Sequence, residues 1–316
     1  MLGYILRRVL YTVPIAIGVT VVCFALVYLG PSDPISAILP EDAPKELIER
    51  IKKEYGFDKP LPIQYLTWLG KAATGDLGMS IATRRMVIEE IPTALANSLL
   101  LAVLASTLAF SLGTLLGAIA GYWYGRAVDR AVTAVAVVGV SVPHYWLAIV
   151  LVIIFSVELD VLPSMGMGPD GSTNFSLTAE NLRHLVLPTI ALSLIPTAIV
   201  ARTVRESVRE TLAQEYVQAL RAKGLTERAV LRHVAKNAAP TVLAVMGLQL
   251  GYLLGGSILV ETVFAWPGTG LLLNNSIFSR DIPMLQGVIL VLALFFVTLN
   301  LVVDILQAAL DPRIKR

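Results

Sequence analysis

The feature that most constrains this chain is a series of long stretches that contain no Asp, Glu, Lys or Arg. The hydrocarbon core of a bilayer is about 30 Å thick, so a helix that crosses it needs roughly 20 apolar residues. Hydrophobic residues make up 56% and charged residues 15% of the chain, whereas soluble domains hold about 25% charged residues. This composition excludes a disordered chain, a secreted disulfide scaffold and a soluble nucleic-acid binder. We therefore expect an all-α integral membrane protein with six transmembrane helices, at residues 9–29, 95–121, 132–157, 185–203, 239–260 and 283–305.

The distribution of lysine and arginine predicts how these helices are oriented. Cytoplasmic loops carry an excess of Lys and Arg, and short loops weigh most in this rule. If both termini lie inside, most of the 25 basic residues also fall inside, and the short outside loops hold only Arg183 and Arg280. We therefore expect an N-in, C-in topology.

Two uncharged stretches need separate treatment. The first span follows Arg7 and Arg8, as a signal peptide would, but its apolar run is longer than a usual signal core and lacks a cleavage pattern. We expect a retained anchor. The run 262–279 contains the turn-forming segment WPGTG and the polar segment NNS, so we do not assign it as a span. A re-entrant segment remains an open alternative there.

These assignments divide the chain into three parts. The N-terminus and first span occupy 1–29, an extracytoplasmic cap follows at 30–93, and a core of five spans at 94–316 includes cytoplasmic helices at 206–238. In the cap, apolar residues recur at helical spacing over 44–55 and 63–73, which predicts two short helices. The mixed charges of the cap fit either a solvated cover or a docking surface for an outside partner.

The inside segment between spans four and five, at 206–240, is too long and too regular for a simple connection. Residues 205–223 are strong helix formers with apolar side chains at helical spacing. Gly224 stands where a left-handed helix cap is expected, and Thr226 can N-cap a second helix at 227–238, after which Pro240 opens span five. The two helices suit either a basic amphipathic hairpin on anionic lipid or an elbow inserted into a groove of a partner protein.

The segment EYVQALRAKGL at 215–225 resembles the cytoplasmic coupling motif, or EAA loop, of binding-protein-dependent ABC importers. Its form is similar to that of the dipeptide, oligopeptide and nickel permease family. The general motif has Glu before two alanines and ends in Leu-Pro, whereas here Gln218, Ala219 and Leu220 stand at the matching positions and the proline is displaced to Pro240. The resemblance implies an ATPase-coupling site formed by Glu215, Tyr216, Ala219, Arg221, Ala222, Lys223, Gly224 and Leu225.

Further segments extend the resemblance over nearly the whole chain. They are GDLGMS at 75–80, SVPHYW at 141–146, LPSMG at 162–166, HLVLPT at 184–189, ETVFAWPGTG at 261–270 and a C-terminal segment at 304–313 that ends in DPR. The long loop after the first span is expected of the B-type member of the two homologous permeases. The resemblance implies a type I ABC importer permease fold, multi-pass in a prokaryotic inner or plasma membrane.

The function that the resemblance implies is that of a membrane-spanning permease subunit in an ATP-driven, binding-protein-dependent importer. It would form half of the translocation path for di- or oligopeptides, with nickel complexes or oligosaccharides as alternative cargoes. The implied partners are a homologous second permease of the C type, two cytoplasmic ATP-binding subunits, an extracytoplasmic substrate-binding protein and membrane lipid. ATP and magnesium would be bound by the ATP-binding subunits, and this chain would bind no cofactor or metal.

The sequence lacks the motifs of an enzyme. It contains no G-x-x-x-x-G-K-[ST] phosphate loop, no H-E-x-x-H and no G-x-S-x-G. We therefore expect a transport subunit without its own ATPase site. The glycines at Gly113, Gly117 and Gly121 recur within a span, where they predict close helix packing rather than phosphate binding.

Few residues within the spans could line a translocation path. Carriers coupled to protons or sodium usually hold ionisable groups near mid-membrane, and the absence of a central carboxylate argues against the alternative function, a stand-alone secondary carrier. Pro143 and Pro196 can kink helices and free carbonyl groups, and His144 lies beside one kink. With Asn300 they are the candidate path residues, although structural kinks and a packed histidine explain them equally well.

Overall fold

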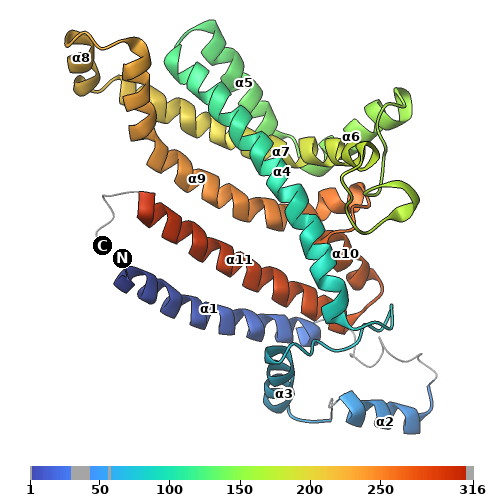
Figure 1. Ribbon diagram of the computed structural model, residues 1–316. Helices are drawn as coiled ribbons and strands as arrows, with labels where there is room; N and C mark the ends of the chain where they lie inside the picture. The colour runs from blue at the N-terminus through green and yellow to red at the C-terminus, as the bar shows by residue number, and fades with distance from the viewer. Residues whose placement is uncertain (1, 30–42, 56–57, 311–316) are drawn as a thin grey trace. The chain divides into compact units, whose positions relative to one another are not determined.

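The computed structural model describes residues 2–29, 43–55 and 58–310, and these residues are mostly helical (Figure 1). The only β-type pairing among them is an isolated bridge between Met79 and Met86. The C-terminal DPR segment and residues 30–42 of the predicted cap lie outside the described residues. The helices are α1 (Leu2–Leu29), α2 (Lys45–Tyr55), α3 (Leu61–Ala73), α4 (Val87–Tyr122), α5 (Ala127–Ser141), α6 (His144–Val152), the π-helical η2 (Ile153–Glu158), the 3-10 turn η3 (Pro169–Gly171), α7 (Ala179–Leu212), α8 (Glu215–Ala222), α9 (Glu227–Val263), α10 (Thr269–Phe278) and α11 (Ile282–Leu310).

Membrane-crossing length is reached by several of these helices. Among the described residues, α4, α7 and the part Ile282–Val303 of α11 are each long and apolar enough to cross a bilayer. Two bent helix pairs, α5 with α6 and η2, and the two parts of α9, raise the number of candidate spans to five. In α1 the apolar part Leu10–Ala25 is shorter than the other candidates. The expected integral membrane, all-α class is thus supported, with three to five spans by length and composition.

The expected span at 132–157 is not one continuous helix, and the kink that Pro143 was expected to allow is present as a full break. Residues Ala127–Ser141 and His144–Glu158 form two helices that meet at 95°. The break falls at Val142, which is extended with φ −85° and ψ 122°. Pro143 explains this conformation, because its ring disfavours the α region for the preceding residue and its nitrogen has no proton to donate.

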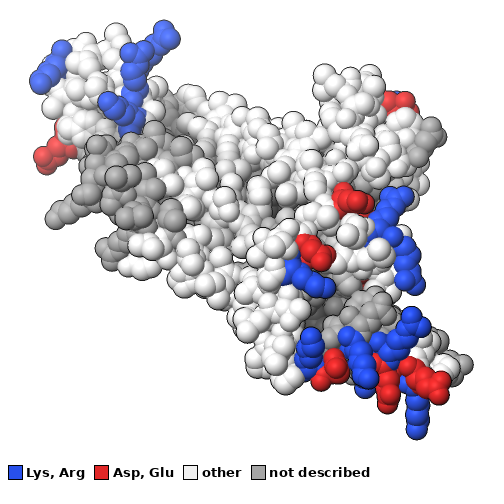
Figure 2. Space-filling model, turned by 60° about the horizontal axis from the view of Figure 1, so that its bottom comes forward, with Lys and Arg blue, Asp and Glu red and all other residues white. Residues whose placement is uncertain are grey.

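The chain forms two compact units, which are described separately. Unit 1 comprises Met1–Asn97 and Pro267–Thr298, and unit 2 comprises Ser98–Trp266 and Leu299–Arg316. Both expected cap helices exist, as α2 and α3 in unit 1. In the same unit the Tyr65 hydroxyl of α3 hydrogen-bonds Thr20 of α1 at 2.8 Å, and its ring lies edge-on to Phe24. Charged side chains of both signs crowd the cap at the lower right of Figure 2.

A buried carboxylate joins two distant segments of unit 1. Asp281 precedes α11 and accepts a hydrogen bond from the Met284 backbone N–H at 3.2 Å, which caps the helix. Its other oxygen accepts from the hydroxyl of Ser80 and from the Ala82 N–H, the latter at 3.1 Å. Ser80 closes the GDLGMS segment, so this segment has a structural role in holding the cap to α11.

Glycines bring α4 and α7 into direct contact in unit 2. A Cβ atom on Gly113 would lie 2.8 Å from the carbonyl oxygen of Thr197, and one on Gly121 would lie 2.7 Å from that of Arg205. At Gly117, between them, the carbonyl oxygen of Ala201 is closer still. Since real Cβ contacts are not this short, these positions accept only glycine. The predicted close packing of the glycine-rich span is confirmed.

Candidate functional site

The candidate coupling residues lie on a helical elbow formed by the end of α7, α8 and the start of α9. The expected continuous helix over 205–223 is wrong, because α7 ends at Leu212 and α8 begins at Glu215. Between them Gln214 is extended, with φ −76° and ψ 146°, and its carbonyl accepts the Val217 N–H at 3.0 Å. This break turns α8 so that its apolar side meets α7 and α9.

The second expected helix, at 227–238, is not a separate element. It is the first part of α9, which continues through Pro240 to Val263. A proline inside a helix removes one backbone hydrogen bond but does not always end the helix in membrane proteins. The second arm of the elbow is therefore the start of a helix that also contributes to a candidate span.

Gly224 closes α8 with the backbone geometry that the sequence predicts. Its φ is +78°, a left-handed conformation that costs non-glycine residues about 1–2 kcal/mol. The Gly224 N–H donates to the carbonyl of Arg221 at 2.9 Å, and the Leu225 N–H donates to that of Leu220 at 3.3 Å. This pair of bonds is the Schellman motif of helix ends. The expected N-cap is also present, because the Thr226 side chain accepts from the Ala229 N–H at 3.4 Å.

Two side-chain contacts connect the arms of the elbow. The Arg221 guanidinium donates to the Glu227 carboxylate, Nε to Oε1 at 2.9 Å and Nη2 to Oε2 at 3.3 Å. The Asn237 amide donates to the Tyr216 hydroxyl at 3.1 Å. These contacts join α8 to α9 on both sides of the glycine, so the elbow is braced as well as bent.

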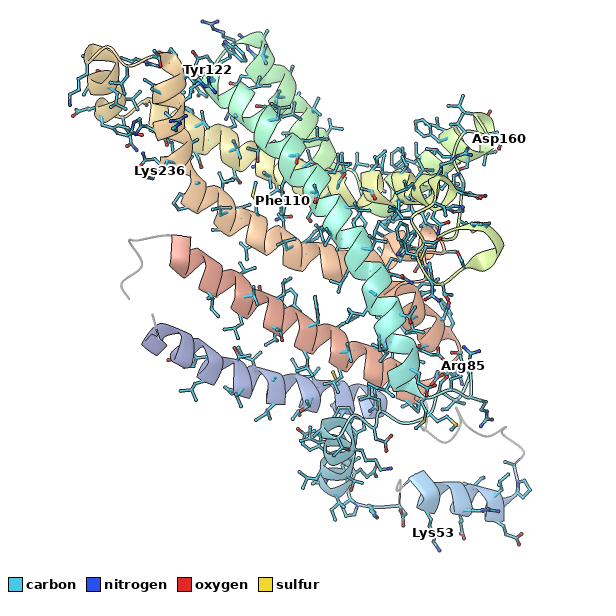
Figure 3. All side chains as sticks on the ribbon, viewed as in Figure 1. Lys53, Arg85, Phe110, Tyr122, Asp160 and Lys236 are labelled. Carbon is cyan, nitrogen blue, oxygen red and sulfur yellow. The ribbon has the colours of Figure 1, made fainter. Side chains whose placement is uncertain are left out.

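A cluster of valines anchors the elbow to the rest of unit 2. Val217 of α8 and Val230 of α9 are fully buried, with exposed fractions of 0%. They pack with Val204 and Val208 of α7. Phe110 of α4, labelled in Figure 3, packs against the same cluster. Val217 is the anchoring residue that sequence reasoning missed. Its signal was weak, because α8 has only 8 residues and few apolar positions to establish a period.

The eight candidate coupling residues come together on this elbow. Glu215, Ala219, Arg221, Ala222, Lys223 and Gly224 are exposed, while Tyr216 and Leu225 are partly buried against the valine cluster. Lysine and arginine side chains project from the elbow at the upper left of Figure 2. The elbow thus presents an exposed, basic, small-residue tip on a buried apolar base.

The candidate path residues lie on three different helices. Pro143 and His144 begin α6, Pro196 is buried within α7, and Asn300 lies in α11. The His144 ring packs edge-on to Tyr252 of α9, with 6.5 Å between ring centroids. Its Nε2 is buried without a hydrogen-bond partner among the described residues. Those residues also contain no group of three or more His, Cys, Asp and Glu that could hold a metal ion.

Comparison with known proteins shows the family to which the chain belongs. The family described as "Binding-protein-dependent transport system inner membrane component" matches residues 113–316, and its N-terminal family matches residues 1–102. The dipeptide transport system permease protein of Alkalihalophilus pseudofirmus is 40% identical, with 100% of both chains covered. A glutathione transport system permease protein of Escherichia coli is 39% identical over 100% of this chain and 99% of its own.

A solved structure shares the fold. A chain from the inward-facing MetNI methionine ABC transporter aligns with a TM-score of 0.54 and 17% sequence identity, covering 71% of this chain and 96% of that one. The fold and the sequence matches agree with the family resemblance seen in the motifs. The chain belongs to the family of inner membrane components of binding-protein-dependent transport systems, and it is a multi-pass permease subunit of such an importer.

Proposed function

We propose that this permease imports di- or oligopeptides in an ATP-driven complex and that the Gly224 elbow is its contact with the ATPase. The observation that carries the proposal is the elbow itself, an exposed tip held on a buried valine base and braced on both sides of the bend. A peptide cargo is supported by the dipeptide and glutathione permeases that the chain resembles over its whole length.

The elbow would act as a lever. Its tip would sit in a groove of one cytoplasmic ATP-binding subunit, and closure of the ATPase pair would displace it. Because the part Glu227–Leu253 of α9 begins in the elbow and continues into a candidate span, the displacement would reach the membrane helices directly. Such coupling requires the elbow to bind the two ATPase states with different free energies. ATP and magnesium would be bound by the ATPase subunits.

The complete importer would contain four further subunits. They are a homologous C-type permease that forms the other half of the path, two ATP-binding subunits and a substrate-binding protein that docks on the cap. We propose six spans, with α1 as the first, in an N-in, C-in topology. The basic elbow is consistent with this topology, because basic segments favour the cytoplasmic side. The charged surface of α2 in the cap is consistent with docking of a soluble protein.

The candidate path is centred on His144 and extends to Pro143, Pro196 and Asn300. The Nε2 of His144, which is buried without a hydrogen-bond partner among the described residues, supports this role, because buried polar atoms without a partner are rare. The buried side-chain oxygens of Thr189 and Gln249, on α7 and α9 of the same unit, also have no hydrogen-bond partner among the described residues. Peptide amides could pair with such groups during passage.

A pair of glycine substitutions tests the lever. Gly224→Val should strain the elbow. We expect lower peptide uptake and weaker stimulation of ATPase activity by peptide, with membrane insertion unchanged. Gly125→Val is the matched control, because Gly125 has the same φ of +78° and the same open space around its Cα but lies in the α4–α5 turn. Equal uptake by the two variants would contradict the coupling role. Uptake by the purified chain alone in vesicles without ATP would instead identify a stand-alone carrier.

The cargo needs its own experiment. The binding protein that co-purifies with the complex should carry short peptides, which mass spectrometry of its extracted ligand would identify. Recovery of nickel complexes or oligosaccharides instead would overturn the peptide assignment. It would not affect the proposed contact between the elbow and the ATPase.

A further inference from the structure

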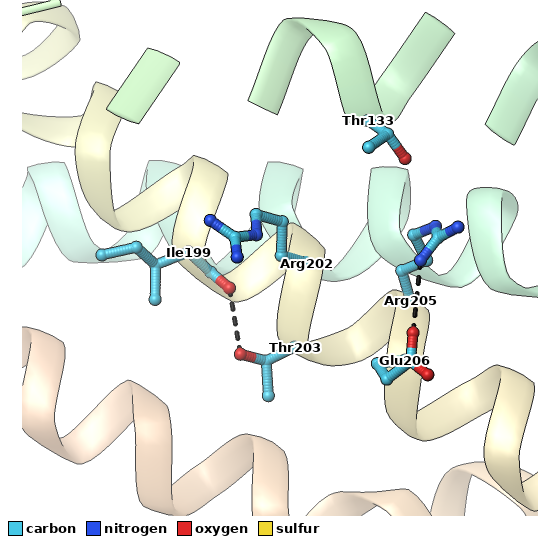
Figure 4. A pocket seen from close by; sticks show the side chains of 6 residues that line it. All are labelled: Thr133, Ile199, Arg202, Thr203, Arg205 and Glu206. Atoms are coloured by element: carbon cyan, nitrogen blue, oxygen red, sulfur yellow. Dashed lines mark hydrogen bonds and ion pairs between the residues drawn. The ribbon is translucent and has the colours of Figure 1, made fainter. Parts of the chain in front are cut away.

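Unit 2 contains a cavity of about 410 Å³ between α5 and α7 (Figure 4). Thr133 contributes from α5, and Ile199, Arg202, Thr203, Arg205 and Glu206 contribute from α7. The candidate coupling and path residues do not line it. Its lining combines an apolar wall with several charges, which is the mixture expected of a site for an amphipathic ligand.

Most charges around this cavity are already paired within the protein. Arg205 binds Asp129 at two points, Nε to Oδ1 at 2.5 Å and Nη2 to Oδ2 at 3.1 Å. Glu206 pairs with Arg205 at 3.2 Å and with Arg209 at 2.6 Å. The Thr203 hydroxyl donates to the Ile199 carbonyl at 3.0 Å, so its proton is also used.

Arg202 is the exception. Its side chain is exposed and makes no hydrogen bond or ion pair among the described residues. The paired network of Asp129, Glu206, Arg205 and Arg209 is neutral, so Arg202 leaves the cavity with a single unmatched positive charge and unused N–H donors. A singly charged anion with oxygen acceptors complements this lining, because the guanidinium fork matches two phosphate oxygens.

The position of the cavity along the helices indicates where that anion would come from. The uncharged stretch of α7 ends at Ala201, directly before Arg202, and that of α5 begins at Ala131, near Thr133. Exposed aromatic side chains lie at the end of α4, namely Tyr122, Trp123 and Tyr124. Aromatic residues and the first charges after an apolar stretch mark the headgroup layer of a bilayer. From these markers we infer that the cavity lies near the depth of lipid phosphates.

We propose that this cavity binds the singly charged phosphodiester of a phospholipid headgroup, with Arg202 as its ligand and Ile199 against the lipid glycerol and chains. The proposal depends on the membrane location of the chain and is independent of the lever at Gly224. In the N-in topology the lipid belongs to the cytoplasmic leaflet. It would fill the space between α5 and α7 next to the base of the elbow.

Native mass spectrometry of the purified importer complex tests this site. Delipidated wild type and the Arg202→Gln variant are titrated with phosphatidylglycerol, and the variant should bind one high-affinity lipid about tenfold more weakly, since a charge-assisted contact is lost. The lipid affinity of Arg202→Lys should fall between those of the wild type and Arg202→Gln, because lysine keeps the positive charge but lacks the planar guanidinium group. Arg126→Gln is the matched control, since Arg126 is exposed at the start of α5 but does not line the cavity. It should bind like the wild type.

Four results would overturn the proposal. Equal lipid affinity of the wild type and Arg202→Gln would mean that the cavity holds no lipid phosphate. An equal loss in Arg126→Gln would mean that the surface charge as a whole attracts lipid. Displacement of the lipid by millimolar inorganic phosphate would identify free phosphate as the natural ligand, and displacement by a dipeptide would assign the cavity to the translocation path. Diacylglycerol, which lacks the phosphate, should bind the wild type and Arg202→Gln alike.

Discussion

Arg221 and Glu227 form a two-point ion pair across the Gly224 bend, with Nε–Oε1 at 2.9 Å and Nη2–Oε2 at 3.3 Å. Both side chains are about half exposed, with fractions of 44% and 51%. Water and salt therefore screen the pair, and it stabilises the fold only slightly. It lies across the bend and, with the Asn237–Tyr216 hydrogen bond, connects α8 to α9.

Removal of this pair should leave stability nearly unchanged. We expect Arg221→Ala and Glu227→Ala to couple by about 0.2–1 kcal/mol in a double-mutant cycle, as exposed pairs do. The coupling should fall at high salt. Thermal melting of the four proteins at low and high ionic strength measures it. A coupling that is large and independent of salt would mean that a partner surface shields the pair.

Val217 should be the residue whose loss detaches α8. Because its side chain is fully buried against α7 and α9, Val217→Ala should cost about 2 kcal/mol of local stability. Hydrogen–deuterium exchange over 215–225 should accelerate while exchange in α4 stays slow. Gln218→Ala, at the neighbouring exposed position, provides the control and should exchange like the wild type. If both variants behave alike, the valine cluster does not hold the elbow.

Gly117→Ala should separate α4 from α7. The added methyl group would clash with the Ala201 carbonyl, and overpacking of this kind typically costs about 1–3 kcal/mol. Gly70→Ala in α3 is the matched control, because nothing lies within 4 Å of the added carbon. Helical alanine is favoured over glycine by roughly 0.5–1 kcal/mol, so this variant should melt at the same or a higher temperature. A Gly117→Ala protein with unchanged melting temperature would show that α4 can move away from α7 without cost.

Asp281→Asn should loosen the cap segment in unit 1. The Asp281 carboxylate accepts hydrogen bonds from Met284 on one oxygen and from Ser80 and Ala82 on the other. An asparagine amide has one acceptor oxygen, so it cannot accept from both groups of donors. An unsatisfied buried group costs about 1–3 kcal/mol. Limited trypsin digestion should then cut faster after the exposed Arg84 and Arg85. Asp76→Asn, at an exposed site in the same motif, should be cut at the wild-type rate, and equal rates for both variants would refute this role of Asp281.

Several features could be predicted from local sequence because they depend on residues close in the chain. The left-handed Gly224, the Thr226 cap and the two cap helices each follow from a few neighbouring residues, and all are present. A kink at Pro143 was also predicted as a possibility, and the helix does break there, at Val142. The break at Gln214 and the continuation of α9 through Pro240 were not predicted, because helix propensity and the proline rule each allowed two outcomes at these points.

The sequence by itself determined that this chain is a helical membrane protein of the importer permease family, because charge-free stretches and ordered motifs are properties of residue order alone. Only the tertiary structure decided that Val217 anchors the elbow, that Asp281 holds Ser80, and that the Arg202 side chain finds no partner in the described part of the chain, beside the neutral Asp129–Arg205 network. The physical reason is distance along the chain. The burial of a side chain and its ion pairs depend on which segments, distant in the sequence, pack together in the fold. Apolar periodicity and the number of charges do not specify those contacts.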